Sequence, residues 1–489
     1  MRRSLYILPV LAFLFVLNAC YDDDSTLPVE KITEIDITDN AKDTINLYLG
    51  DNISIDPQSS DAGEEVSWQW SMGTYRTNPV SGDVTTVFKE IATTRKLEYK
   101  TTELGHYFLR LVVSNGYGST IKYYHIFVNS EFEEGYLILG RKENGKGSLA
   151  FMKTLTPEEV AQGMKPEFRQ NLFAYTNGGK ELGEGPVDCD KIADKLYILC
   201  GREQKVYQID AKSFQLVFEF DYNRYEGDFY PQDLISYDSP YCREIYSTSP
   251  NGGVAKIQQA DLEIYSYTDL PQNIKFTRTY DRPNYSASKV IAFIDDVNSQ
   301  IYAYGVSTGF QFGYFDCYGY FRDREIIQVF YDEDGNLIVY SIKEGKYLLT
   351  KIGSSLTSIP SIMAGNPELD IISEKECTVN PALLNRESVL QVNDPNSCLL
   401  FSNGNKVYKW AYNQSEIPDQ AFIPLPENEV VKCMNQSTDQ KQLYIATYNS
   451  SRQGLKGSLY IYDVDTGQII GEPYEGIADE PVKVMYKVK

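Results

Sequence analysis

The amino-acid sequence predicts an all-β protein in which an N-terminal β-sandwich is followed by a β-propeller. Apolar and polar residues alternate over short stretches bounded by turn residues, whereas hardly any window shows the 3.6-residue spacing of a helix. A strand-turn-strand unit recurs from Gly135 onward. The 489 residues include 39 tyrosines, and tyrosine suits half-buried strand faces. This length exceeds what one hydrophobic core usually serves, so more than one domain is expected.

The first 19 residues have the layout of a signal peptide. In MRRSLYILPVLAFLFVLNAC, two arginines precede a mostly apolar run, and small or polar residues follow it. The apolar run is shorter than the roughly 20 residues that a spanning helix needs, so residues 1–19 are expected to be a removable targeting segment. Cleavage after Ala19 by the ordinary signal peptidase would put the bulky Leu17 at position −3, where small residues are preferred.

Residues 17–20, Leu-Asn-Ala-Cys, resemble the bacterial lipobox. The resemblance implies that Cys20 becomes the first residue of the mature chain and carries a diacylglycerol, because only a thiol forms the required thioether. Each buried methylene contributes about 0.8 kcal/mol, so several acyl chains anchor a protein firmly where one does not. The alternative is a cleaved, soluble form.

An acidic run follows the cysteine within a linker over residues 20–30. Asp22, Asp23 and Asp24 are similar to the signal that follows the lipidated cysteine in surface-exported lipoproteins of some Gram-negative bacteria. The alternative is a merely solvated linker. We therefore expect a protein that is lipid-anchored in the outer membrane and faces the cell exterior.

Residues 31–130 show short alternating strands with polar turns every eight to twelve residues, as in a β-sandwich. The stretch GHYFLRLVVSNGYG resembles the late strands of the PKD domain, an immunoglobulin-like module, and Trp68 or Trp70 is then the core tryptophan. The alternation predicts that Leu109 faces inward with Tyr107, Leu111 and Val113, ahead of a turn at Asn115. The residues that match the PKD pattern are Gly105, Tyr107, Leu111, Val113 and Asn115.

Residues 135–489 predict a β-propeller, and the hairpin count predicts seven blades. Seven hairpins over this range give about 50 residues each, which is a blade period. No Trp-Asp blade ending is present, and the final strand-like piece at Pro481 lacks a hairpin partner. We expect that piece to close the ring by joining the first hairpin. The hairpins begin at Tyr136, Lys195, Arg243, Lys289, Asn336, Ser397 and Gln442.

Taken together, the lipobox, the acidic run, the PKD-like module and the propeller-like remainder resemble the PKD-like lipoproteins encoded beside SusC/SusD-type nutrient importers. The resemblance covers nearly the whole chain, although its motifs are diffuse beyond the first 130 residues. It implies an accessory role in the uptake of oligosaccharides or oligopeptides, with the SusC/SusD-type transporter proteins as partners.

The sequence carries no catalytic signature. A net charge of −22 opposes nucleic acids. His106 and His125 are the only histidines, and both fall on predicted sandwich strands, so a histidine-dependent hydrolase or a three-histidine metal site on the propeller is excluded. No nucleophile elbow, P-loop or dinucleotide fingerprint is present. We expect no catalytic residue, no metal and no cofactor.

Two further patterns favour structural roles. Seven cysteines remain after Cys20 without Cys-x-x-Cys spacing, and several lie inside apolar strands, so buried free thiols are expected, although export would permit a disulfide. The DEDGN stretch at Asp332 begins like a calcium loop but has Lys343 at its twelfth position. It is expected to be a hairpin turn, as is DVDTG at Asp463.

Aromatic clusters at Phe220 and Gly313 are the remaining indication of a ligand site. They mix rings, charges and glycine, which suits loops that stack on a ligand, although packing between blades is an alternative for any single tyrosine. Tyr318 and Tyr320, separated by one glycine, are the best candidates for exposed rings. The residues predicted to bind ligand are Tyr314, Tyr318, Tyr320 and Trp410.

Three functions stay open at the level of the sequence. The first is a non-catalytic surface lipoprotein that assists a SusC/SusD-type importer by capturing ligand, docking on the transporter, or both. The second is a propeller-based glycoside hydrolase with paired carboxylates, because such a pair needs to meet only in space. The third is a purely structural subunit of the transporter complex.

Overall fold

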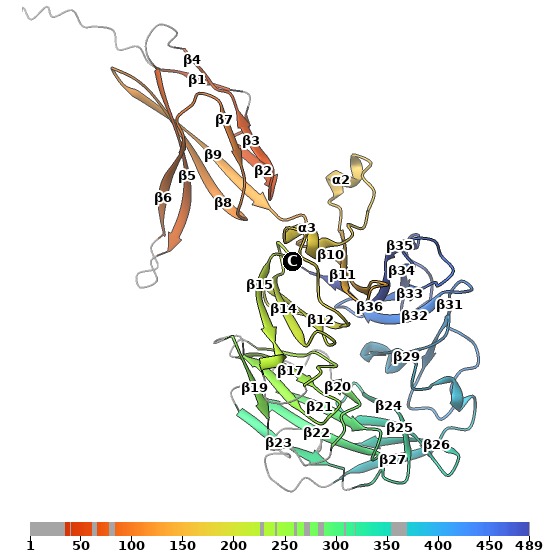
Figure 1. Cartoon of the computed structure of the whole chain (residues 1–489). Helices are drawn as coiled ribbons and strands as arrows, with labels where there is room; N and C mark the ends of the chain where they lie inside the picture. Colours follow the sequence, from red (N-terminus) through yellow and green to blue (C-terminus); the bar gives the residue numbers. More distant parts are fainter. Residues whose placement is uncertain are drawn as a thin grey trace, which may run out of the picture. The chain divides into compact units, whose positions relative to one another are not determined.

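The computed structural model describes residues 35–488, apart from 40, 61–65, 78–83, 225–228, 240–241, 259–261, 268–273, 282–287, 308–309, 318 and 354–368. The chain divides into two compact units with a boundary after Ser130, and each is described by itself. Both consist mainly of β-strands, so the predicted all-β class is confirmed (Figure 1). None of the helices among the described residues is long and apolar enough to cross a membrane.

Unit 1 contains a five-stranded sheet in the order β2-β9-β8-β5-β6 and two small sheets, β3-β7 and β1-β4. β2 runs parallel to β9, and the other pairings are antiparallel. The strands are β1 (Ile37–Thr38), β2 (Thr44–Tyr48), β3 (Asn52–Ile55), β4 (Gln58–Ser59), β5 (Val66–Thr77), β6 (Val84–Ala92), β7 (Leu97–Lys100), β8 (Gly105–Asn115) and β9 (Ser119–Asn129).

The core of unit 1 lies on one face of the five-stranded sheet. Leu109, Leu111 and Val113 of β8 are fully buried, whereas the residues between them are only half-buried. This is the period-two pattern of a strand with one covered face, and it confirms the inward-facing set predicted from the sequence. The turn predicted at Asn115 is also present, because its Oδ1 accepts hydrogen bonds from the backbone N–H groups of Tyr117 and Gly118.

The core tryptophan of unit 1 is Trp70. Its side chain is fully buried, and its Nε1–H donates to the carbonyl oxygen of Thr94 at 2.9 Å, so the one polar atom of the indole is satisfied. Trp68 is only half-buried. Tyr107 packs at the edge of the same core, and its hydroxyl donates to the carbonyl oxygen of Leu104 at 3.0 Å, three residues upstream.

Unit 2 contains, among the described residues, six four-stranded sheets and one three-stranded sheet, all antiparallel. The sheets follow one another around a ring in a propeller-like arrangement (Figure 1). The strands of the first four sheets are β10 (Gly135–Arg141), β11 (Gly147–Lys153), β12 (Pro186–Ile192), β13 (Lys195–Cys200), β14 (Lys205–Asp210), β15 (Leu216–Asp221), β16 (Ile235–Ser239), β17 (Cys242–Thr248), β18 (Val254–Gln258), β19 (Glu263–Tyr267), β20 (Arg278–Asp281), β21 (Ser288–Asp295), β22 (Gln300–Ser307) and β23 (Phe310–Asp316).

The remaining three sheets of four strands complete the series, and a last strand returns to the first sheet. These strands are β24 (Glu325–Tyr331), β25 (Leu337–Lys343), β26 (Lys346–Ile352), β27 (Ile371–Glu376), β28 (Leu390–Asn393), β29 (Cys398–Asn403), β30 (Lys406–Trp410), β31 (Ile423–Pro424), β32 (Val430–Gln436), β33 (Gln442–Tyr448), β34 (Gly457–Asp463), β35 (Tyr474–Ala478) and β36 (Glu480–Lys487). Three short 3-10 helices are η1 (Tyr222–Arg224), η2 (Pro381–Leu383) and η3 (Asp394–Asn396).

The core of unit 2 is divided into seven clusters, each shared by two successive sheets. β29 illustrates the principle. Leu399 packs with Ile338 of the preceding sheet, and Leu400 packs with Ile445 of the following sheet, while both leucines are fully buried. Because alternate residues of one strand enter two different cores, the middle strands read as continuous apolar runs.

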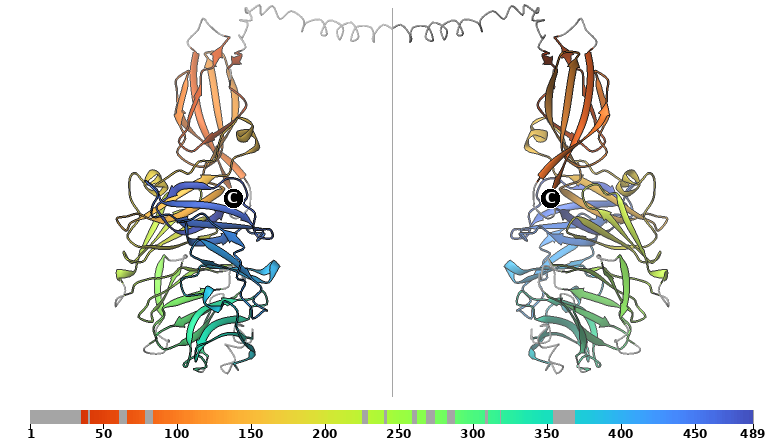
Figure 2. Two further views of the ribbon diagram at one scale, coloured as in Figure 1. Left: turned by 90° about the vertical axis from the view of Figure 1, so that its right-hand side faces the viewer. Right: turned by 90° about the vertical axis from the view of Figure 1, so that its left-hand side faces the viewer.

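The ring closes through the first and last strands. β10 pairs with β11 on one side and with β36 on the other, so that Tyr136 lies opposite Tyr486 and Ile138 opposite Val484. Figure 2 shows the blue C-terminal strands beside the first hairpin from two sides. The prediction that the piece at Pro481 joins the first hairpin is confirmed.

All seven hairpins predicted from the sequence are present as the pairs β10-β11, β13-β14, β17-β18, β21-β22, β25-β26, β29-β30 and β33-β34. The strands that flank them, such as β12 and β15, were not among the predicted hairpins. Those strands carry more polar residues because they border the middle of the ring or its outside.

Aspartates make the tight turns, as the sequence predicts. Asp332 Oδ1, between β24 and β25, accepts from the N–H groups of Asp334 and Asn336 at 3.1 and 2.8 Å. Asp463 Oδ1, between β34 and β35, accepts from the N–H groups of Asp465 and Thr466 at 3.1 and 2.8 Å. Both carboxylates therefore replace missing backbone partners in a turn.

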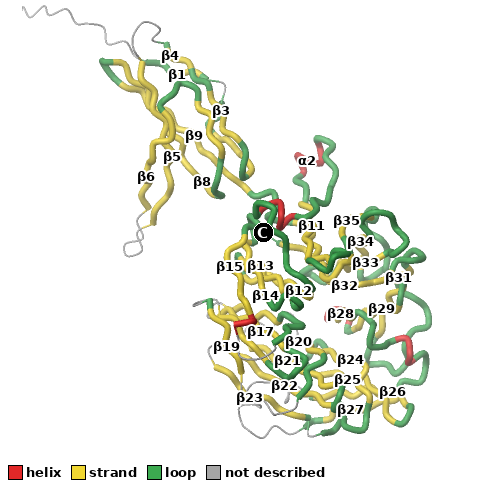
Figure 3. Tube along the Cα trace, in the orientation of Figure 1, coloured by secondary structure: helices red, strands yellow, loops and turns green. Residues whose placement is uncertain are grey.

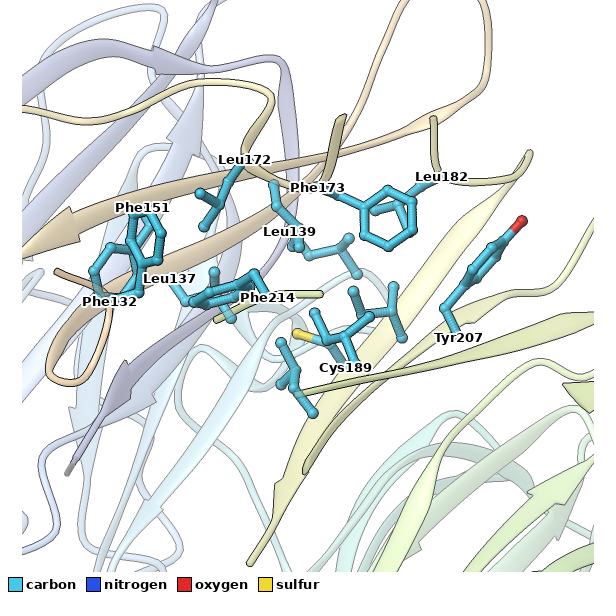
Figure 4. Packing of buried hydrophobic residues seen from close by; sticks show 14 of the residues in the cluster. Phe132, Leu137, Leu139, Phe151, Leu172, Phe173, Leu182, Cys189, Tyr207 and Phe214 are labelled. Carbon is cyan, nitrogen blue, oxygen red and sulfur yellow. The ribbon is translucent and has the colours of Figure 1, made fainter. Parts of the chain in front are cut away.

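An insertion between β11 and β12 carries helices α2 (Pro157–Ala161) and α3 (Leu172–Thr176), which appear as short red segments in Figure 3. α3 contributes Leu172 and Phe173 to the core shared by the first two sheets, where they meet Phe151, Phe214 and Leu182 (Figure 4). The insertion is thereby held against the ring. The segment after it, residues 180–185, forms one wall of the cavity described below.

The cysteines of unit 2 are buried and unpaired wherever the structure describes their side chains. These six confirm the expectation of buried free thiols, and the side chain of Cys242 lies outside the description. Burial raises the pKa of the Cys200 and Cys433 thiols to about 12, so both stay protonated and inert. The six residues are Cys189, Cys200, Cys317, Cys377, Cys398 and Cys433.

Candidate functional site

Several of the predicted functional residues lie outside what the structure describes. Cys20 and the aspartates at 22–24 belong to the N-terminal stretch that is left out, and so does Tyr318 within unit 2. Tyr314 lies on β23, but its side chain is outside the description. The lipid anchor, the acidic signal and these two rings therefore stay predictions.

Tyr320 is held by a charged cluster of its own sheet. Its hydroxyl donates to Glu374 Oε2 at 3.0 Å, and the guanidinium carbon of Arg324 lies 4.4 Å from its ring centroid. Arg324 Nη1 and Glu374 Oε2 are 2.5 Å apart, which closes the triangle. Burial and the hydrogen bond to Glu374 raise the pKa of Tyr320. The ring is half-buried, so it is anchored rather than free to stack on a ligand.

The prediction that Trp410 contacts a ligand is wrong. Trp410 lies at the end of β30, is 0% exposed, and packs in the core between the fifth and sixth sheets with Tyr340 at a ring-centroid distance of 6.1 Å. The sequence indicated a ring near a turn, but both faces of β30 are covered by neighbouring sheets. The aromatic segment at Phe220 behaves alike, since Phe220 and Tyr222 are each 1% exposed in the core between the second and third sheets.

Unit 2 has a charged cavity of about 500 Å³ beside β14 and β15. Its walls are the segment that precedes β12, the turn between β13 and β14, and single residues from β14 and β15. Cations and carboxylates alternate around it, and Tyr207 supplies the one ring. The lining residues are Lys146, Lys180, Glu181, Leu182, Gly183, Glu184, Arg202, Glu203, Lys205, Tyr207 and Glu219.

The lysines of this cavity are paired with its carboxylates. Lys146 Nζ lies 2.7 Å from Glu181 Oε2, Lys205 Nζ lies 3.0 Å from Glu203 Oε1, and Lys180 pairs with Glu219. Hydrogen bonding to Lys146 lowers the pKa of Glu181, so that carboxylate is ionised at neutral pH. Exposed pairs of this kind contribute little to stability, and a ligand that carries both charges can exchange partners with them at low cost.

Gly183 shapes the cavity by letting a carboxylate lie against the backbone. A Cβ atom at this position would fall 1.6 Å from Glu203 Oε2, which only glycine avoids. Glu203 Oε2 accepts from the backbone N–H of Glu184 and from the hydroxyl of Tyr207, both at 3.2 Å. The glycines of this segment were noted in the sequence for turn-forming ability, whereas the cavity depends on the missing side chain.

A second polar cluster lies around Asp233, just ahead of β16. Its carboxylate accepts from the backbone N–H and the hydroxyl of Thr248, both at 2.7 Å, and from the hydroxyl of Thr279. Burial raises the pKa of Asp233 to about 6, although these hydrogen bonds oppose the shift. Lys483 Nζ on β36 lies 2.8 Å from Asp188 Oδ1 on β12. No spacing in the sequence identifies this cluster, because its members come from different sheets.

The two histidines lie on adjacent strands of unit 1, with His125 Nδ1 and His106 Nε2 3.5 Å apart. His125 is exposed and His106 is half-buried, in line with the prediction of strand-surface residues. Within the described part of the chain, no group of three or more His, Cys, Asp or Glu side chains is arranged to hold a metal ion.

No protein-family model and no curated protein matches this chain. Among solved structures, a quinonprotein alcohol dehydrogenase-like protein from Bacteroides thetaiotaomicron is 14% identical, covering 94% of this chain and 98% of that chain, with a TM-score of 0.49. A protein from Bacteroides caccae is 12% identical over 60% of this chain and 99% of that chain, with a TM-score of 0.37. AztD from Citrobacter koseri is 6% identical over 86% of this chain and 97% of that chain, with a TM-score of 0.35. These likenesses are too distant to transfer an activity.

Proposed function

We propose that this chain is a non-catalytic surface lipoprotein of a bacterial outer membrane that assists a SusC/SusD-type importer in capturing oligosaccharides or oligopeptides. The observation that carries the proposal is the order of parts in one chain, namely a lipobox ending at Cys20, an acidic run, and then two rigid β-units. A short tether of this kind leaves the folded units outside the membrane, where a nutrient or a transporter is met.

The finer fold assignment belongs to the same proposal. Unit 1 is a PKD-like, immunoglobulin-like sandwich, and three features support this. Trp70 is the buried tryptophan of its core. The hydrogen bond from Tyr107 to Leu104 has the form of a tyrosine corner. β2 also pairs in parallel with β9, so the first and last long strands of the unit lie side by side.

Unit 2 is a seven-bladed propeller in this proposal. Its seven sheets and the seven clusters between them support the assignment, as does the closing pair β10-β36. Closure removes the open edges along which sheets otherwise associate, so the ring offers a rigid frame for its connecting loops.

The test begins with the anchor in the native bacterium. Wild-type protein is expected to incorporate radiolabelled palmitate, to be cut by external protease on intact cells, and to co-purify with a β-barrel transporter from detergent-solubilised outer membranes. Cys20→Ala is the matched variant and is expected to lose the label. A wild-type protein that takes up no palmitate, or that external protease leaves intact, contradicts the proposal.

One observation favours a second candidate, a carboxylate-dependent glycoside hydrolase. Asp233 has a pKa raised by burial to about 6, which is the property of a general acid, and the charge of Asp188 contributes to that shift. A turnover screen on glycans separates the two functions. Product release by the wild type that is lost in Asp233→Asn would replace the non-catalytic proposal.

A further inference from the structure

One face of the five-stranded sheet of unit 1 carries a continuous set of aromatic side chains. Because Leu109 and Leu111 of β8 and Tyr124 of β9 point into the core, the alternate residues of both strands point to the opposite face. We call this opposite surface the aromatic face. It is formed by Tyr75 of β5, Phe88 of β6, His106 and Phe108 of β8, and Tyr123 and His125 of β9.

The rings of the aromatic face contact one another across strands. Ring-centroid distances are 5.1 Å between Tyr75 and Phe108, 4.9 Å between Phe108 and His125, and 6.3 Å between Phe88 and Tyr123. Tyr75 is 45% and Tyr123 is 48% exposed. The set is therefore a connected surface that remains open to solvent, unlike the rings of unit 2 that fill its cores.

A glycine keeps this surface low at its middle. Gly73 of β5 lies between Phe88 of β6 and Phe108 of β8 in the strand register. A Cβ atom on Gly73 would lie 2.6 Å from Phe88 Cε1, so the phenylalanine ring occupies the space where a side chain would stand. The ring thus lies across the neighbouring strand and extends the aromatic face sideways.

Hydrogen-bonding groups border the rings, and their charges balance. The guanidinium carbon of Arg110 lies 4.2 Å from the ring centroid of Phe88, and its Nε is buried with no hydrogen-bond partner among the described residues. Glu90 accepts from Gln69 Nε2 at 2.6 Å. The face thus holds one guanidinium and one carboxylate, together with two imidazoles, and carries no net charge when the imidazoles are neutral.

We propose that the aromatic face binds a neutral oligosaccharide; this rests on the proposed function in so far as the captured nutrient is a sugar. A pyranose ring has an apolar C–H face that stacks on aromatic rings, and hydroxyl groups around it that pair with groups such as the unpartnered donor of Arg110. A balanced site complements an uncharged ligand, and the net charge of −22 opposes polyanionic glycans. The sheet places rings and polar groups on one rigid surface, so little ordering is needed on binding.

The test uses the full-length protein in detergent and affinity gel electrophoresis in gels containing a neutral β-glucan, xylan, mannan or starch. At least one of these polymers is expected to retard the wild type. Tyr75→Ala and Phe108→Ala are each expected to weaken that retardation by about tenfold, the effect of losing one stacking ring. Tyr117→Ala is the matched control, since Tyr117 is 55% exposed in the turn after β8 and lies outside the aromatic face. Melting temperatures and circular dichroism check that each variant is folded.

The proposal is overturned if none of the four polymers retards the wild type, or if Tyr75→Ala and Tyr117→Ala weaken retardation equally. It is equally overturned if only a uronic-acid polymer is bound, or if the aromatic face instead holds two copies together, which size-exclusion chromatography of Phe108→Ala would reveal as a lost dimer. Retardation without transporter co-purification would defeat the proposed function alone. Co-purification that survives in Tyr75→Ala while glycan binding is lost supports both.

Discussion

The two units use the same residue types in opposite ways. In unit 1 only one face of each long strand is covered, so β8 alternates between buried and half-buried residues, and its outward rings reach solvent. In unit 2 each sheet is packed on both sides, so β13 is buried from Leu196 to Cys200. Tyr75 and Tyr123 are therefore surface residues, whereas Tyr197 and Tyr340 are fully buried. The number of covering layers, rather than the residue type, decides whether a tyrosine can meet a ligand.

The sharpest test of this contrast removes one core tryptophan from each unit. Trp70→Ala and Trp410→Ala are each expected to lower the free energy of unfolding of their own unit by about 3–5 kcal/mol, because both indoles are fully buried. Calorimetry of the full chain measures the effect if the units melt separately. Trp68→Ala is the control, and its half-buried ring predicts a smaller loss. Equal losses for Trp68 and Trp70 would contradict the one-faced core of unit 1.

The next effect is a pH dependence confined to unit 2. Burial raises the pKa of Asp233 from 3.8 to about 6, so the folded state binds more protons than the unfolded state between these values. The stability associated with protonated Asp233 is complete below pH 4 and is lost as the pH rises through 6, by about 3 kcal/mol.

Asp233→Asn isolates this term, because the asparagine does not titrate. The difference in denaturation midpoint between wild type and variant is expected to move against the wild type from pH 4 to pH 6.5 and to stay constant above pH 7. A difference that does not vary with pH would show that the carboxylate is ionised with its ordinary pKa.

A smaller effect is expected at the start of β8. Tyr107→Phe removes the hydrogen bond to the carbonyl oxygen of Leu104 and keeps the ring, so unit 1 should lose about 1 kcal/mol. Tyr117→Phe removes an exposed hydroxyl and serves as the matched control. Chemical denaturation measures both, and identical midpoints for the two variants would remove the support that this contact gives to the immunoglobulin-like assignment.

The smallest effect is expected in the charged cavity. Lys146→Ala breaks an exposed pair with Glu181, and such pairs are screened by water and salt. No measurable change in the unfolding of unit 2 is expected at physiological ionic strength. A clear loss of stability would mean that the cavity is a structural brace instead of a rim whose pairs can exchange with a ligand.

Much of the local architecture was predictable from the sequence. The inward set of β8, the turn at Asn115 and the seven hairpins follow from patterns only a few residues long, and such patterns need no knowledge of distant neighbours. The joining of β36 to the first hairpin was also predicted, because a strand without a partner must find one or expose its edge.

The sites were less accessible to prediction. Trp410 and Tyr320 were selected as rings near turns, but the sheets on either side of β30 enclose the first, and Arg324 with Glu374 engages the second. The aromatic face escaped notice because its rings belong to four strands that are separated in the chain by up to 50 residues. No short sequence window contains them together.

What the sequence alone determined is the β class, the hairpins and, through its first 24 residues, the expectation of a lipid anchor, since each of these depends on residues adjacent in the chain. Only the tertiary structure decided which alternate face of a strand is covered. In unit 1 the five-stranded sheet is left with one open face, and in unit 2 successive sheets cover both. The physical reason is that burial is a property of neighbouring layers, and the chain brings those layers together from far apart.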